Sequence, residues 1–267
     1  TKVTYTIDSS EVKKAQIKYN IETDKPYFID SLYAKVQSQD LETLFTLNKQ
    51  RSVIKEGKQY NSAILDEERE RITTLFRNNG AYDFQKTYIN YEVDTIGKVY
   101  KASINLIIDN KTIKQGDTLV KEPFKLYNIS EVNVFTLNNA ADNRRKLTDT
   151  IVYNDTKIIS EDKLNYRPKT LSNAIFIEPN EKFSDMRRLL TSRSLSNLKV
   201  FNYPSIEYIK DPKDSTGQSL ITNITLVPKK RATFIPSIDV THSNIQDFGV
   251  QGTVGVQFNN VFKGAEI

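Results

Sequence analysis

The sequence contains no cysteine and only one histidine, His242. Without cysteine, neither disulfide bonds nor thiolate metal ligands can form within these 267 residues. A lone histidine has no second imidazole with which to share a metal ion, so no metal site is expected. The sequence also lacks an apolar run long enough to form a transmembrane helix.

Patterns that carry catalysis are also missing. The chain has no glycine-rich phosphate loop and no GxSxG sequence. The acidic pair Glu67-Glu68 lies beside Arg69 and Arg71, an arrangement typical of ion pairing on a helix surface. The formal net charge is +5, but the basic residues are interspersed with acidic ones and form no long basic run. We therefore expect no enzyme, no cofactor and no nucleic-acid partner.

The sequence does contain one strand pattern three times. Each copy has a β-branched residue, then a tyrosine two positions later, then an aspartate three positions after the tyrosine. Apolar and polar residues alternate along each copy, which predicts a strand, and the aspartate suits a turn. A second alternating run follows each copy, so each predicts a β-hairpin. The paired runs are 3–8 with 15–19, 89–94 with 102–106, and 206–211 with 222–226.

A helix is predicted before the second and the third hairpin. Asn61 and Ser184 are suited to cap the amino ends of these helices. The first helix is expected over 61–79, ending at the helix-stop pair Asn79-Gly80. Glu68 falls within its apolar arc. It is either a carboxylate at the edge of the apolar stripe or a partly buried one bonded to a backbone N–H group or an arginine.

The order of these elements divides the chain into four parts. A further strand is predicted at 28–36 and again at 127–135, with a short helix at 40–47. Residues 25–111 thus read strand, helix, helix, strand, strand. Residues 112–230 repeat this order with an insertion at about 136–173. The insertion is polar, notably at Asn143-Arg144-Arg145, and has a hairpin turn at Asn154-Asp155, so we expect it to project from the last unit. Residues 1–24 supply only a closing hairpin.

The last part, 231–267, has a different character. Residues 247–259 alternate strictly, and 233–243 alternate as well. A transmembrane β-strand needs ~9–11 residues that are apolar toward lipid and small or polar on the other face, and residues 247–259 satisfy this. A soluble amphipathic hairpin is the alternative. The apolar face of the second run consists of Phe248, Val250, Gly252, Val254, Val256 and Phe258.

The tandem strand-helix-helix-strand-strand order over 1–230 resembles the POTRA domains of the Omp85 family of outer-membrane proteins. The run from Thr191 to Tyr208 resembles the last POTRA domain in Bacteroidota-type members, and residues 260–266 resemble an early barrel turn. The most similar branch is the TamA-like lipoproteins (TamL). The resemblance implies an α+β fold of tandem POTRA domains, each a mixed three-stranded sheet with two helices on one face. It also implies that 231–267 are the first strands of an outer-membrane β-barrel. The chain is then expected to begin inside a domain and to continue past Ile267.

The resemblance further implies a periplasmic binding role for the edge strands 87–93 and 205–210. Their backbone groups would pair with unfolded outer-membrane protein clients. A TamB-like partner spanning the periplasm, and outer-membrane lipid around the barrel, are the other implied partners. Tyr88, Asn90 and Glu92 are expected to be exposed, and the N–H group of Asn90 is expected to be an edge donor. A BamA-type core insertase, or a POTRA-like interaction or adhesion protein, is the alternative. The candidate binding residues are Tyr88, Ile89, Asn90, Tyr91, Glu92, Val93, Ile206 and Tyr208.

Overall fold

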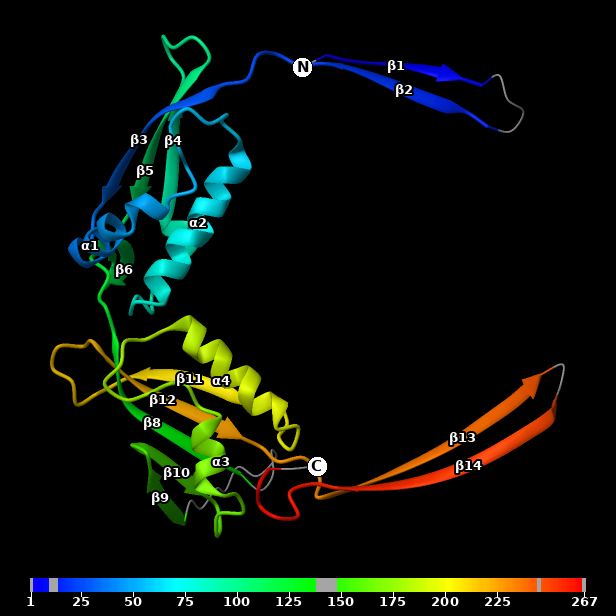
Figure 1. Cartoon of the computed structure of the whole chain (residues 1–267). Helices are drawn as coiled ribbons and strands as arrows, with labels where there is room; N and C mark the ends of the chain where they lie inside the picture. The colour runs from blue at the N-terminus through cyan, green and yellow to red at the C-terminus, as the bar shows by residue number, and fades with distance from the viewer. Residues whose placement is uncertain (1, 10–13, 138–147, 244–245, 266–267) are drawn as a thin grey trace. The chain divides into compact units, whose positions relative to one another are not determined.

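The computed structural model describes residues 2–9, 14–137, 148–243 and 246–265 (Figure 1). The chain divides into two compact units, one made of Thr1–Thr73 with Gln85–Phe124 and the other of Thr74–Phe84 with Lys125–Ile267. Both mix helices and strands, as the α+β prediction requires. No helix in the described ranges is long and apolar enough to cross a membrane.

The first unit contains a mixed three-stranded sheet in the order β3-β5-β4. The strands are β3 (Phe28–Val36), β4 (Ile89–Asp94) and β5 (Lys101–Ile108). β5 pairs parallel with β3 and antiparallel with β4, so the hairpin predicted at 89–106 is confirmed. Figure 1 shows α1 (Gln39–Leu47) and α2 (Ser62–Arg77) on the same side of this sheet.

Helix α2 begins and packs as its sequence predicts. The Asn61 side chain accepts a hydrogen bond from the N–H group of Ala63 at 2.9 Å, which confirms the cap. Leu65 and Ile72 of α2 are buried. Glu68 is also fully buried, and it accepts bonds from the N–H group of Val53 at 2.9 Å and from Arg71 at 2.7 and 2.9 Å. The hydrogen-bonded alternative is therefore the correct one for Glu68.

The second unit has a five-stranded sheet in the order β11-β12-β8-β10-β9, so the prediction of three strands is wrong for this unit. Strand β12 pairs parallel with β8 and antiparallel with β11, which repeats the arrangement of the first unit. The additional strands come from the insertion, because β10 pairs parallel with β8. The strands are β8 (Asn128–Thr136), β9 (Asp149–Tyr153), β10 (Thr156–Ser160), β11 (Ser205–Lys210) and β12 (Ser219–Leu226).

The described part of the insertion, residues 148–173, is part of the core and does not project from it. Its turn is the predicted one, since Asn154 and Asp155 both have positive φ. Ile158 of β10 and Leu171 of α3 (Pro168–Asn173) are buried with the apolar side chains of the sheet and of α4 (Asp185–Asn197). Burying these residues while pairing β8 is more favourable than leaving β8 as an open edge. The polar run 143–145 lies outside the described residues.

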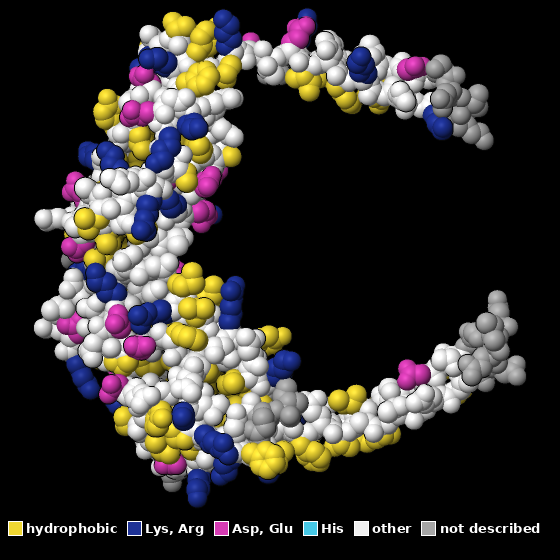
Figure 2. Space-filling model, in the orientation of Figure 1, with side chains coloured by type: hydrophobic (Ala, Val, Ile, Leu, Met, Phe, Trp, Pro, Cys, Tyr) yellow, Lys and Arg dark blue, Asp and Glu magenta, His cyan; other side chains and the backbone are white. Residues whose placement is uncertain are grey.

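Three further hairpins form two-stranded sheets: β1 (Lys2–Asp8) with β2 (Gln16–Glu22), β6 (Lys111–Gln115) with β7 (Thr118–Glu122), and β13 (Ala232–Ser243) with β14 (Gln246–Phe258). The first and last were predicted, whereas β6–β7 was missed, although Gly116-Asp117 is a turn signal between alternating runs. Figure 2 shows hydrophobic side chains along β1–β2 and β13–β14.

Both faces of β13–β14 follow from its register. Phe234 lies opposite Val256, and Ile238 lies opposite Gly252, so apolar residues of the two strands share one face. Their side chains are largely exposed, with Ile238 at 75% and Phe234 at 64%. The other face pairs Ser237 with Thr253, with Ile235 as an apolar exception.

Candidate binding edges of the two sheets

The predicted binding strands both lie at a sheet edge. β4 is the outer strand of its sheet next to β5, and β11 is the outer strand next to β12. Each therefore pairs with another strand along one side only. An edge strand presents the N–H and C=O groups of every second residue to its surroundings, and these groups can pair with another chain.

Two hydrogen bonds decide which residues of β4 face outward. The C=O group of Tyr88 accepts from the N–H group of Asp109 at 3.1 Å, so Tyr88 faces the β5 side. The C=O group of Ile89 instead accepts from the Nε atom of Arg69 at 3.1 Å, so Ile89 faces away from β5. Because the direction alternates along an antiparallel strand, Tyr91 and Val93 also face outward. Their N–H groups are therefore directed away from β5.

The same argument applies to β11. The N–H group of Asp211 donates to the C=O group of Ser219 at 2.9 Å, so Asp211 faces β12. Because the direction alternates along the strand, the backbone N–H and C=O groups of Ile206, Tyr208 and Lys210 point away from β12. The two repeats therefore present equivalent backbone groups, since Tyr208 stands in β11 where Tyr91 stands in β4.

The expectation for Asn90 is wrong. Asn90 lies opposite Ile107 in the inward-facing set, so its N–H group is directed to β5 and is not an edge donor. Only its side chain is exposed, and the Nδ2 atom donates to Asp109 Oδ2 at 3.2 Å. Glu92 shares this orientation and is exposed as predicted.

Tyr88 also differs from the expectation. It belongs to a short 3₁₀ helix, Lys86–Tyr88, and the strand begins only at Ile89. Its ring is half-buried and packs edge-on against Phe124, with the ring centroids 4.9 Å apart. The Tyr88 side chain therefore packs against Phe124 and is not fully exposed as expected.

In β4, the residues whose backbone N–H and C=O groups point outward direct their side chains into or toward the core. Ile89 is 2% exposed, Tyr91 is half-buried and Val93 is 37% exposed. Arg69 lies over the Tyr91 ring, 5.1 Å from its centroid. Burial, and then the charge of Glu68, raise the pKa of the Tyr91 hydroxyl, so it stays protonated. That hydroxyl is buried and has no hydrogen-bond partner among the described residues.

Beside β11 lies an aromatic recess of about 430 Å³. The rings of Tyr82 and Phe183 lie 5.7 and 5.1 Å from the Tyr208 ring, and Ile206 lines the same recess. Burial raises the pKa of Tyr208. No cluster of His, Asp or Glu suited to a metal ion occurs among the described residues.

No family model and no curated protein matches this sequence. The chain is similar to BamA from Haemophilus ducreyi lacking POTRA domains 1–3, with 12% identity and a TM-score of 0.49 over 88% of this chain and 35% of that one. It is also similar to Haemophilus influenzae BamA POTRA3-5, with 9% identity and a TM-score of 0.38 over 85% of this chain and 71% of that one. A third similar structure is CdiB from Acinetobacter baumannii, with 13% identity and a TM-score of 0.37 over 92% of this chain and 37% of that one. This chain thus spans little more than a third of the first of these proteins. Because the identities are 9–13% and the TM-scores lie below 0.5, these similarities carry no functional argument. Function is therefore inferred from the chain's own residues.

Proposed function

We propose that this chain is the periplasmic POTRA region of an Omp85-family outer-membrane protein and takes part in the assembly or translocation of outer-membrane proteins. The edges of β4 and β11 bind extended client segments. The protein is not an enzyme in this proposal, because its ligand is paired to the sheet and not transformed.

The observation that carries this proposal is the equivalent backbone orientation of the two edges. Tyr91 and Tyr208 each direct a backbone N–H and C=O group outward while their side chains pack inward. Such an edge binds through main-chain hydrogen bonds, which depend little on the sequence of the added strand. This property suits a module that meets many different unfolded chains.

The hairpin β13–β14 supports the membrane part of the proposal. Its strands have 12 and 13 residues, against the ~9–11 that a tilted transmembrane strand needs. One face is apolar and exposed, and the other is small or polar apart from Ile235. We therefore assign residues 231–267 to the first strands of an outer-membrane β-barrel, preceded by POTRA domains at 25–111 and 112–230 and by the closing hairpin of another at 1–24.

Within the family we propose the TamA-like lipoprotein branch, with a TamB-like periplasmic partner. The similarity of the run Thr191–Tyr208 to the last POTRA domain of Bacteroidota-type members favours this branch over a BamA-type core insertase.

A proline at an outward-facing position tests the proposal. Val93→Pro removes an outward N–H group without removing a ladder bond to β5, whereas Val93→Ala keeps the donor and loses the side chain. Lys210→Pro and Lys210→Ala form the matching pair in β11. We expect the proline variants to impair outer-membrane protein assembly in cells and the alanine variants to be nearly silent. Assembly is read from the heat-modifiable electrophoretic mobility of folded β-barrel proteins.

Two controls make the result decisive. Glu92→Pro removes an inward ladder donor, so we expect it to unfold the sheet and show how a folding defect differs from an edge defect. Val93→Pro must match Val93→Ala in cellular level and in thermal unfolding. Equal client assembly in these two folded variants would show that the edge is not used. Crosslinkers at Asn90 and Glu92 separate the two cases. Our proposal requires many different client adducts, whereas an unused edge beside a docked partner would give one discrete adduct.

A further inference from the structure

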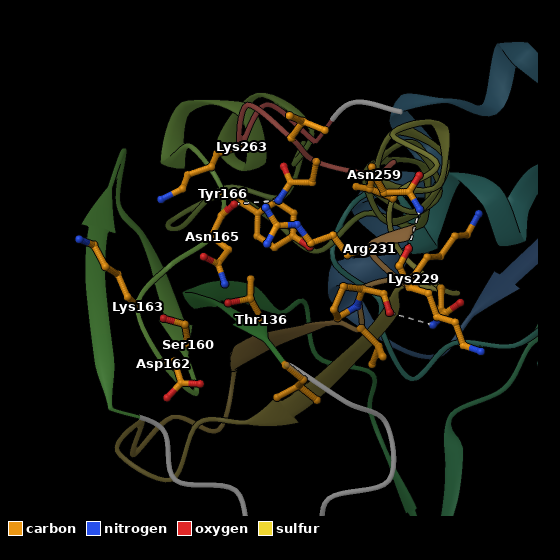
Figure 3. Close-up of a pocket in the computed structure, with 18 of the residues that line it drawn as sticks. Thr136, Ser160, Asp162, Lys163, Asn165, Tyr166, Lys229, Arg231, Asn259 and Lys263 are labelled. Atoms are coloured by element: carbon orange, nitrogen blue, oxygen red, sulfur yellow. Dashed lines mark hydrogen bonds between the residues drawn. The ribbon is translucent and has the colours of Figure 1, made fainter. Parts of the chain in front are cut away.

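A basic cavity of about 850 Å³ lies at the base of the hairpin β13–β14 (Figure 3). Figure 3 shows Lys163 and Lys263 at one side of the view, Lys229 at the other, and Arg231 between them. Lys230 also lines the cavity, which gives five cationic side chains against one carboxylate, Asp162.

The cavity is built by the segments that anchor the hairpin. Before β13, the N–H group of Lys229 donates to the C=O group of Val200 at 2.8 Å. After β14, Asn259 Nδ2 donates to the C=O group of Lys230 at 2.7 Å, and the C=O group of Lys263 accepts from the N–H group of Arg167 at 2.8 Å. Both ends of the hairpin are thus fixed to one unit, and the five cationic residues line one cavity.

Within the described ranges, these five cations have no acidic side chain as an ion-pair partner. No ion pair joins Lys163, Lys229, Lys230, Arg231 or Lys263 to any Asp or Glu side chain that the structure describes, whereas Lys157 on β10 does pair with Glu131 at 2.6 Å. Five cations against one carboxylate leave an excess of positive charge, which raises the local potential and attracts an anion.

Neutral hydrogen-bond donors complete the cavity. The Tyr166 side chain lines it and is only 8% exposed. Burial raises the pKa of Tyr166 to about 12, so its hydroxyl stays protonated near neutral pH and can donate. Asn260 also lines the cavity, and its Nδ2 atom donates to the C=O group of Asn165 at 2.9 Å, which fixes the turn. Cations together with O–H donors are the groups that bind phosphate oxygens.

We propose that this cavity binds the phosphate group of an anionic lipid headgroup at the membrane surface. Arg231 is adjacent to Ala232, where the apolar face of β13 begins, and Ala232 lies opposite Phe258 at the end of the apolar face of β14. If the hairpin lies in a membrane, as the proposed function has it, the cavity is at headgroup level. Basic residues at that level attract anionic lipids.

Vesicle co-sedimentation of the whole chain tests this site. The triple variant Lys163→Gln/Arg231→Gln/Lys263→Gln removes three cations from the cavity. The control Lys35→Gln/Lys58→Gln/Lys114→Gln removes three exposed cations from the first unit and changes the net charge equally. At about 1 kcal/mol for each basic side chain, the cavity variant should bind phosphatidylglycerol-containing vesicles on the order of hundredfold more weakly than the unmodified chain. Its binding to neutral phosphatidylcholine vesicles, and all binding by the control, should be unchanged.

The other outcomes overturn the inference in distinguishable ways. Equal losses in the two triple variants would mean that total charge, and not the cavity, attracts the vesicles. Equal binding of the unmodified chain to both vesicle types would overturn the headgroup site alone, whereas binding to neither would also count against the proposed placement of the hairpin. Inorganic phosphate should release the chain from vesicles more strongly than chloride at equal ionic strength. Equal release would show charge screening only and would overturn a built phosphate site. Saturable phosphate binding without any vesicle preference would assign the cavity to the free anion.

Discussion

Replacing Glu68 by alanine should be among the most destabilising substitutions in the first unit. The carboxylate is fully buried and accepts three hydrogen bonds, one from the N–H group of Val53 and two from Arg71. Alanine would leave the Val53 donor without its acceptor and the Arg71 guanidinium without its counter-charge. The loop at Val53 would also lose this hydrogen bond to α2.

The size of the effect follows from these contacts. Removing one partner of a buried ion pair costs ~3–5 kcal/mol, because an uncompensated charge stays behind. The Arg71 side chain is 19% exposed and can regain some hydration, which places the expected loss near ~3 kcal/mol. Glu68→Gln keeps the shape and one carbonyl acceptor but removes the charge, so we expect about 1–2 kcal/mol.

Hydrogen exchange measured by mass spectrometry can locate the effect. Peptides that contain Val53 and the middle of α2 should exchange roughly hundredfold faster in Glu68→Ala, while peptides from β12 serve as an internal reference. A loss below ~1 kcal/mol in Glu68→Ala, or equal losses in the alanine and glutamine variants, would refute the assignment of this carboxylate as a charged tie between α2 and the loop.

Two further predictions concern the second unit and one glycine of the first. Gly80 has φ +105°, and a Cβ atom there would lie 3.2 Å from the backbone of Tyr127, so Gly80→Ala should cost ~2 kcal/mol or more in urea unfolding. Gly57→Ala, with φ +76° and nothing within 4 Å of the new Cβ, should cost only ~1 kcal/mol, and equal losses would exclude the close contact as the cause. Burial acts to raise the pKa of Asp185, but the hydrogen bonds and positive charges of Arg77 and Arg188 together outweigh it and hold the pKa below its ordinary value of 3.8. The carboxylate therefore stabilises the fold at pH values above 3.8 and loses this contribution as the pH falls toward the pKa of the folded state. The difference in stability between the unmodified chain and Asp185→Asn should thus shrink below about pH 4. A difference in stability that stays constant with pH would contradict this prediction.

Local sequence signals predicted the individual elements well. The strand pattern placed the hairpins at 89–106 and 206–226, because alternation with period two identifies a half-buried strand without long-range information. Caps were equally local: Asn61 and Ser184 both accept a bond from the first turn of the helix that follows. The position of Glu68 within an apolar arc raised the bonded carboxylate as one of two readings, and its contacts with Val53 and Arg71 decided between them.

What the sequence could not predict depends on contacts between distant segments. Nothing in 149–160 specifies that β10 pairs with β8, since that choice follows from burying Ile158 beside the core. The orientation of Asn90 depends on the ladder phase, which one bond between Tyr88 and Asp109 fixes. The packing of Tyr88 on Phe124 likewise joins residues that are far apart in sequence.

The inward side chains and outward backbone of β4 and β11 have a consequence for how these edges change during evolution. Position 93 is Val in one repeat and its equivalent, position 210, is Lys in the other, yet both direct the same N–H and C=O groups outward. A main-chain surface survives almost every point substitution, with proline as the exception. The two edges can therefore diverge in side chains and still present the same backbone groups. An alanine scan of either strand will report core packing and will not detect the outward main-chain groups.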